Sequence, residues 1–188
     1  MPRGLTFLVL LTCLSSCAPL KPSGGSEPTE LIPMAQPLDP ARRIVQKITA
    51  FWPGRQETLL CVLELDKYGI AIAGLSTDGV SLFNLNYDGK VLTLEKSPLL
   101  PASFSPQFIV KDLQLVYWPL AELQKTLPRQ WRLEADNHHR RLYHNNELLV
   151  DVDYLQPDVA WAKSVALTNH RYHYKLHIKT ISYEALSE

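Results

Sequence analysis

The 188-residue sequence has few of the features that identify a binding partner directly. Lys and Arg (19) equal Asp and Glu (19), for a formal net charge of +0, so the basic surface expected of a nucleic-acid-binding protein is missing. Its longest mostly apolar run, Leu5 to Leu14, covers ten positions, whereas about 20 helical residues are needed to cross a bilayer. We predict no nucleic acid partner and no transmembrane helix.

Motifs of catalysis and metal binding are also missing. Ser76 does not lie in a Gly-x-Ser-x-Gly sequence, and neither a phosphate loop nor a dinucleotide fingerprint occurs. Asp151 and Asp153 share one face of a predicted strand, but no glycine-bearing calcium loop accompanies them. A polar hairpin, in which we expect exposure to solvent, contains His138, His139, Arg140, Arg141 and His144. We predict a non-enzymatic protein without a metal or cofactor.

The N-terminus has the order of a signal peptide, with Arg3 before the apolar run and Leu14-Ser15-Ser16-Cys17 after it. This ending resembles the lipobox of bacterial lipoproteins, which implies cleavage after residue 16 and palmitate-type acylation of Cys17. Ala18 in place of Asp implies sorting to the outer membrane. We predict a lipid-anchored protein that faces the periplasm. An ordinary signal peptide with an incidental cysteine is the alternative.

Three segments follow from this interpretation: a signal peptide at 1–16, a lipidated cysteine with a tether at 17–41, and one folded domain at 42–188. The tether is rich in proline and contains Ser23-Gly24-Gly25-Ser26, a composition typical of flexible linkers. With Cys13 removed and Cys17 acylated, Cys61 has no disulfide partner. Cys61 alternates with leucines, so we expect a buried thiol rather than a reactive one.

Period-two alternation predicts an antiparallel meander over about residues 45–96, with turns at Asp78-Gly79 and Asp88-Gly89. Residues 106–127 have helical periodicity and are interrupted near Trp118-Pro119, which predicts two short helices. Strands resume after Trp131, with a turn at Asn145-Asn146. A final strand is expected from about Val165 to Tyr183. Its predicted outer face, which is either a solvated edge or a contact for anionic headgroups, holds Arg171, His173, Lys175, His177 and Lys179.

This order of elements resembles the outer-membrane lipoprotein receptor and the carrier of the Lol system. Residues 42–184 are more closely similar to a bacterial lipoprotein family of unknown function that is often encoded with aryl polyene biosynthesis genes. The resemblance implies an α+β fold, namely an incomplete antiparallel β-barrel with a short helical insertion acting as a lid or plug. It also implies a periplasmic Lol-like carrier as a partner.

In Lol-type folds the helical lid covers a hydrophobic cavity for acyl chains. By position, the residues of that lid here are Phe108, Ile109, Leu113, Val116, Trp118, Leu120 and Leu123. An ordinary helix packed on a sheet would show the same apolar stripe. Leu75 is the counterpart of an apolar leucine that the receptor projects toward the membrane; a leucine buried at the end of a strand is the alternative.

The resemblance and the absence of catalytic motifs lead to one functional prediction and one alternative. We predict an outer-membrane lipoprotein that binds or accepts a lipid-like or acylated molecule, in aryl polyene or lipoprotein transport. The alternative is a structural or assembly lipoprotein that binds another envelope protein through a sheet edge or an apolar patch.

Overall fold

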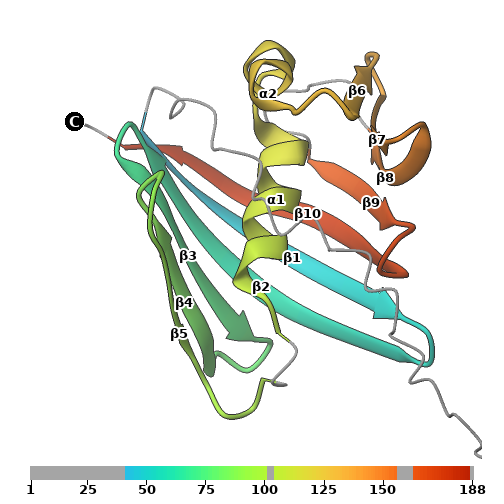
Figure 1. The fold of residues 1–188 in the computed structure, drawn as a ribbon. Helices are drawn as coiled ribbons and strands as arrows, with labels where there is room; N and C mark the ends of the chain where they lie inside the picture. The colour runs from blue at the N-terminus through green and yellow to red at the C-terminus, as the bar shows by residue number, and fades with distance from the viewer. Residues whose placement is uncertain (1–40, 101–103, 156–162, 187–188) are drawn as a thin grey trace, which may run out of the picture. The chain divides into compact units, whose positions relative to one another are not determined.

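A computed structural model describes residues 41–100, 104–155 and 163–186. These residues form one ten-stranded antiparallel sheet and two short helices, an α+β arrangement (Figure 1). The sheet is open, because its strand order runs β5-β4-β3-β2-β1-β10-β9-β8-β7-β6 and ends in two different edge strands. The predicted fold class, an incomplete antiparallel barrel with a helical insertion, is confirmed.

Most of the sheet follows chain order. The strands are β1 (Arg42–Trp52), β2 (Arg55–Asp66), β3 (Gly69–Ser76), β4 (Ser81–Tyr87), β5 (Leu92–Lys96), β6 (Trp131–Ala135), β7 (His139–His144), β8 (Glu147–Tyr154), β9 (Ser164–Asn169) and β10 (Tyr174–Ala185). Two consecutive meanders, β1–β5 and β6–β10, are joined by the pairing of β1 with β10. This pairing leaves β5 and β6 as the edges of the sheet.

Alternation along the strands gives the sheet an inner face, which contacts the helices, and an outer face. On β2 the inner residues Cys61, Leu63 and Leu65 are buried, while Glu64 on the outer face is exposed. Two turns have the predicted glycines at positive φ, at Gly79 and Gly89. Asn145 and Asn146 also have positive φ, which suits a two-residue hairpin turn. The predicted meander and turns are confirmed.

The helices α1 (Pro106–Tyr117) and α2 (Leu120–Thr126) lie between the two edge strands in the chain. Pro106 occupies the first turn of α1, where its missing N–H costs nothing. Trp118 is extended because the next residue is Pro119, so the first helix ends there as predicted. In the described residues no helix is long and apolar enough to cross a membrane.

The chain crosses the sheet to pass from β5 to β6, and α1 and α2 lie on the inner face between these strands (Figure 1). This face and the helices form one apolar core, which includes Ile44, Leu85, Val116, Trp118 and Leu167. Gly74 on β3 is required by this packing, because a Cβ atom there would lie 2.1 Å from the ring of Phe83.

The prediction of one final strand from Val165 to Tyr183 was wrong. The segment folds as a hairpin, β9 and β10, that turns at residues 170–173, and His173 has a φ of 53°. The Asn169 side chain holds the turn by accepting the Tyr172 backbone N–H at 2.9 Å. No glycine marks this turn, so the alternation appeared continuous. Only Lys175, His177 and Lys179 of the predicted basic face lie together on β10, and all are exposed.

Candidate functional site

The residues of the predicted lid form the contact between the helices and the inner face. Leu113, Val116, Trp118 and Leu123 are buried in the core. The others are half-buried: Phe108, Ile109 and Leu120. Burial therefore increases along α1, from a half-buried first turn to a last turn enclosed on every side.

Buried side chains from the sheet hold the C-terminal end of α1. The guanidinium of Arg140, on β7, donates to the carbonyl oxygens of Leu115 at 2.9 Å and Trp118 at 2.6 Å. The hydroxyl of Tyr154, on β8, donates to the Val116 carbonyl at 2.6 Å. These carbonyls have no partner within the helix, and a cation there also complements the helix dipole. Burial lowers the pKa of Arg140, and burial raises the pKa of Tyr154 to about 12.

The expectation that Arg140 is exposed with its polar hairpin was wrong. Its side chain is 6% exposed and shares the inner face with Leu142, whereas Arg141 faces outward. The strand alternation of Arg140 with Leu142 was the signal in the sequence that pointed to burial.

A second, partly buried contact joins the middle of α1 to β10. The Tyr174 hydroxyl donates to a carboxylate oxygen of Asp112 at 2.7 Å and lies 3.2 Å from the amide nitrogen of Asn169. Burial raises the pKa of Asp112 to about 7, and the hydrogen bond from Tyr174 opposes that shift. Burial is also the main reason that the pKa of Tyr174 is raised, with the Asp112 charge adding to it.

Two glutamines lie within this core. Gln46 on β1 is 1% exposed and its amide donates to the Tyr117 hydroxyl on α1. Gln114 is also 1% exposed, and neither its amide nitrogen nor its amide oxygen has a hydrogen-bond partner among the described residues. A buried polar group without a partner costs about 1–3 kcal/mol. Gln114 is thus the least satisfied group in the contact between helix and sheet.

Half-buried apolar side chains also lie on the inner face and at the beginning of α1. Ile48, Leu59 and Leu176, on three neighbouring strands, are only partly buried on the inner face. Phe108 of α1 contacts the ring of Tyr172 in the β9–β10 turn, with centroids 4.5 Å apart. An apolar surface of this kind can bind a hydrocarbon chain by burial alone.

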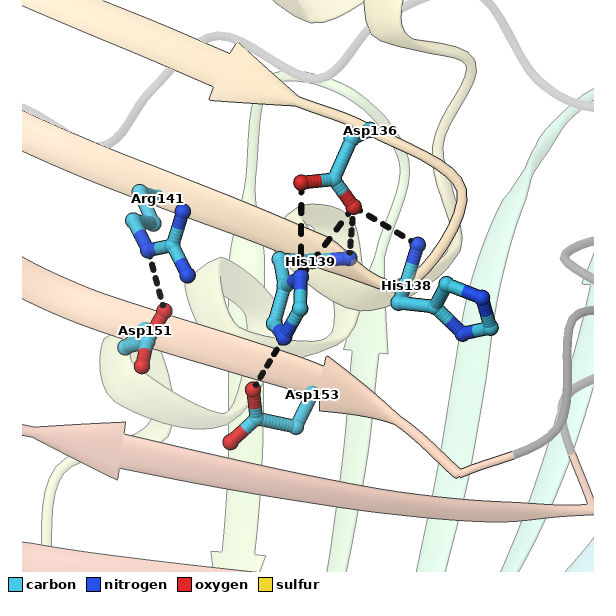
Figure 2. A network of polar contacts seen from close by, with 6 residues as sticks. All are labelled: Asp136, His138, His139, Arg141, Asp151 and Asp153. Carbon is cyan, nitrogen blue, oxygen red and sulfur yellow. Dashed lines mark hydrogen bonds and ion pairs between the residues drawn. The ribbon is translucent and has the colours of Figure 1, made fainter.

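The outer face of β7 and β8 carries a separate network of charged side chains (Figure 2). His139 lies between two carboxylates, with Nδ1 3.1 Å from Asp136 and Nε2 3.3 Å from Asp153. Arg141 is 3.2 Å from Asp151, so the two aspartates of β8 share a face as predicted. In the part of the chain that the structure describes, no three His, Cys, Asp or Glu side chains are grouped to hold a metal ion. Each such half-exposed ion pair contributes about 0–1 kcal/mol to the free energy of unfolding.

Two further predicted residues have clear positions, and one lies outside the described residues. Cys61 is buried and unpaired, and burial raises the pKa of its thiol to about 12. Leu75 lies in β3, half-buried and paired with Leu60 on the outer face, so it is not at the tip of its hairpin. Its contact with a membrane stays a prediction. Cys17 lies outside the described residues.

We compared the chain with models of known protein families, with curated proteins and with solved structures. The chain belongs to the DUF3261 family, described as a protein of unknown function, whose model matches residues 43–182. None of the curated proteins compared with the chain matches it.

Three solved structures are similar to the chain. A LolA superfamily protein from Nitrosomonas europaea has 8% identity and a TM-score of 0.47, over 84% of this chain and 90% of its own. A domain described as an outer membrane lipoprotein-sorting protein, from Vibrio parahaemolyticus, has 12% identity and a TM-score of 0.43, over 79% and 87%. A DUF1329 family protein from Desulfovibrio piger has 9% identity and a TM-score of 0.43, over 83% and 89%. These values are too low to transfer a ligand or partner.

Proposed function

We propose that this protein is a lipid-anchored outer-membrane protein that binds or accepts a lipid-like or acylated molecule without catalysing a reaction. Cys17 is its proposed acylation site, and a periplasmic Lol-like carrier is the proposed donor of the ligand. Aryl polyene or lipoprotein transport is the proposed setting.

The unpaired amide of Gln114 carries this proposal. It lies in the buried contact between helix and sheet, where a polar group without a partner among the described residues is costly. An acylated molecule has an ester, amide or carboxyl group that can pair with such an amide. Its hydrocarbon chain would then lie against Ile48, Leu59 and Leu176, and ten buried methylenes would contribute about 8 kcal/mol.

The hydrogen bonds at the C-terminal end of α1 indicate where the ligand enters. Arg140 and Tyr154 bind the last turn through three hydrogen bonds, so opening that end would leave buried groups unpaired. The first turn, with Phe108 and Ile109, is only half-buried. We place the hydrocarbon chain of the ligand beside the first half of α1, with its polar group reaching inward to Gln114 near the last turn. This makes the helix a partial cover rather than a freely opening lid.

Neighbouring leucines of β2 provide a matched test. Leu59 is on the inner face and Leu60 on the outer face, and both are half-buried. With the mature chain (17–188) carrying Cys17→Ser, we expect a dansyl-labelled fatty acid to bind. Leu59→Glu should weaken that binding about tenfold or more, equivalent to ~1.4 kcal/mol, while Leu60→Glu leaves it within about twofold.

Circular dichroism and thermal melts confirm that both variants are folded before their binding is compared. Equal losses of affinity in the two variants would indicate that the ligand does not bind on the inner face. A parent chain that binds no fatty acid, and that carries no lipid when purified from envelopes, would refute the proposed function.

The edge strands give little support to the alternative of an assembly protein that pairs through its sheet edge. β5 and β6 are five residues long and carry charged side chains, which are features that protect an edge from pairing. Crosslinking in intact envelopes from positions on β5 and β6 would test this alternative.

A further inference from the structure

Two hairpin turns of the first meander are built in the same way. At the β2–β3 turn, the Asp66 carboxylate accepts the backbone N–H of Tyr68 at 2.7 Å. At the β4–β5 turn, the Asp88 carboxylate accepts the backbone N–H groups of Lys90 at 2.8 Å and Val91 at 2.7 Å. These side-chain turns fix the shape of both tips and hold each carboxylate against the backbone.

Each tip presents one large apolar side chain and one ammonium group. Tyr68 is 73% exposed, and the ammonium of Lys67 lies 5.2 Å from the centre of its ring. Val91 is 57% exposed and follows Lys90. Tyrosine with lysine is typical of segments at the interface between a bilayer and water, because each has an apolar body and a polar end. We call Lys67, Tyr68, Lys90 and Val91 the paired tips.

The paired tips lie at the end of the sheet where the described chain begins. Strand register places Arg42 beside Leu65, Leu65 beside Ile70, and Ile70 beside Tyr87, in one row across four strands. The two turns follow directly on this row, so they are neighbours. β10 also ends here, since the backbone N–H of Leu186 donates to the carbonyl of residue 41 at 2.8 Å (Figure 1).

Apolar exposure alone does not distinguish the two ends, because Val80 and Leu99 are exposed at the other one. The two ends are distinguished by the position at which the N-terminal segment enters the folded domain. About 24 residues separate Cys17 from Ala41, and the linker that their composition predicts would have a root-mean-square span of about 27 Å at that length. The 11 residues of β1 extend over about 37 Å. An anchor at Cys17 would therefore keep the paired tips nearer the bilayer than the opposite end.

We infer that the paired tips are a docking surface for a phospholipid bilayer. Tyr68 and Val91 enter the headgroup region, and the ammonium groups of Lys67 and Lys90 meet lipid phosphates. Because Asp66 and Asp88 balance these two charges, the contact depends more on apolar burial than on salt concentration. The inference rests on the proposed anchor at Cys17. It gives the domain one orientation, with the β3–β4 hairpin pointing away from the membrane.

Two exposed valines at opposite ends provide a matched test. The full acylated protein, carrying either Val91→Cys or Val80→Cys, is labelled with a polarity-sensitive fluorophore and reconstituted in vesicles of phosphatidylethanolamine and phosphatidylglycerol. The buried Cys61 thiol, whose pKa is raised to about 12, reacts slowly and leaves the new cysteine as the main target. We expect a blue shift and quenching by spin-labelled lipid for Val91→Cys, both reduced by Tyr68→Ser, and neither for Val80→Cys.

Immersion of the Val80 probe, or equal signals from both ends, overturns the inference; immersion at Val80 would support the contact predicted for Leu75 instead. A protein that binds fatty acid but keeps the Val91 probe in water overturns the docking surface and leaves the proposed function standing. Mass spectrometry of the N-terminal peptide reports the anchor separately. A peptide without acyl chains overturns the anchor and the orientation that rests on it.

Discussion

At the residue scale, Gln114 is buried, and neither atom of its amide has a hydrogen-bond partner among the described residues. It occupies the same helix face as Val110, Leu113 and Tyr117, where an apolar side chain would ordinarily be expected. A polar residue within an apolar stripe was a signal available in the sequence. The predicted lid residues were the apolar members of that stripe, because an apolar stripe alone is enough to predict packing on a sheet.

We predict that Gln114→Leu raises the free energy of unfolding by about 1–2 kcal/mol, because it removes a buried amide that has no partner. The same change should weaken binding of the dansyl-labelled fatty acid. Urea denaturation measures the first effect and fluorescence titration the second. Gln124, whose amide donates to the Leu133 carbonyl at 3.2 Å, is the control. A stability gain in Gln124→Leu equal to that in Gln114→Leu would contradict this account.

The carboxyl group of Asp112 makes a pH-dependent contribution to stability. Burial raises its pKa in the folded protein from 3.8 to about 7, so the folded state holds this proton more tightly than the unfolded state does. The contribution is fully present below about pH 4 and is lost as the pH rises through about 7. We predict that Asp112→Asn flattens the pH dependence of the free energy of unfolding over this range.

Urea denaturation at a series of pH values measures this change. Asp88 is the control, because hydrogen bonds from the backbone N–H groups of Val91 and Lys90 lower the pKa of its carboxyl. Its contribution to the free energy of unfolding therefore has the opposite pH dependence. An Asp112→Asn variant with an unchanged pH profile would show that this carboxyl is not effectively buried in solution.

At the element scale, α1 is held by the second meander more than by its own sequence. It has no basic residue in its last turn and no side-chain cap at its N-terminus. Arg140 and Tyr154 bind its terminal carbonyls from two different strands. The helix therefore depends on tertiary contacts for its C-terminal end.

Neighbouring arginines test this dependence. We predict that Arg140→Met lowers the free energy of unfolding by about 3 kcal/mol, because two buried carbonyl groups lose a charged donor. Arg141→Met should lower the free energy of unfolding by less than about 1 kcal/mol, because Arg141 forms only an ion pair with Asp151 on the outer face. Thermal and urea denaturation measure both values. Similar losses in the two variants would contradict a special role for Arg140 in holding α1.

At the scale of the whole molecule, the proposed anchor accounts for attachment to the membrane, and the folded domain accounts for thermal stability. We predict that Cys17→Ser abolishes labelling by radioactive palmitate in growing cells and releases the protein from the membrane fraction. The melting temperature of the domain should stay unchanged, because Cys17 precedes every described residue. Palmitate labelling that persists in the variant would overturn the acylation site.

Local signals were enough to predict most elements. Alternation identified the strands of the first meander, and Asp-Gly pairs identified two of their turns. Asn145-Asn146 identified the β7–β8 turn of the second meander, and Pro119 identified the break between the helices. The β9–β10 turn was missed because His173 adopts positive φ without glycine or asparagine. The Asn169 side chain, together with the packing of Tyr172 on Phe108, stabilises that turn.

The sequence by itself determined the strand and helix periods, the motif from which we propose N-terminal acylation, and the absence of recognisable catalytic motifs, because each depends on residues close together in the chain. Only the tertiary structure decided that β1 pairs with β10, across more than a hundred residues. That pairing makes β5 and β6 the edges and carries α1 over the inner face between them. It brings Gln46, Gln114 and Arg140 into one interior, beside the partly buried Asp112. Burial there makes an unpaired polar group costly and raises the pKa of Asp112, and neither effect can be predicted from the neighbouring residues in the sequence.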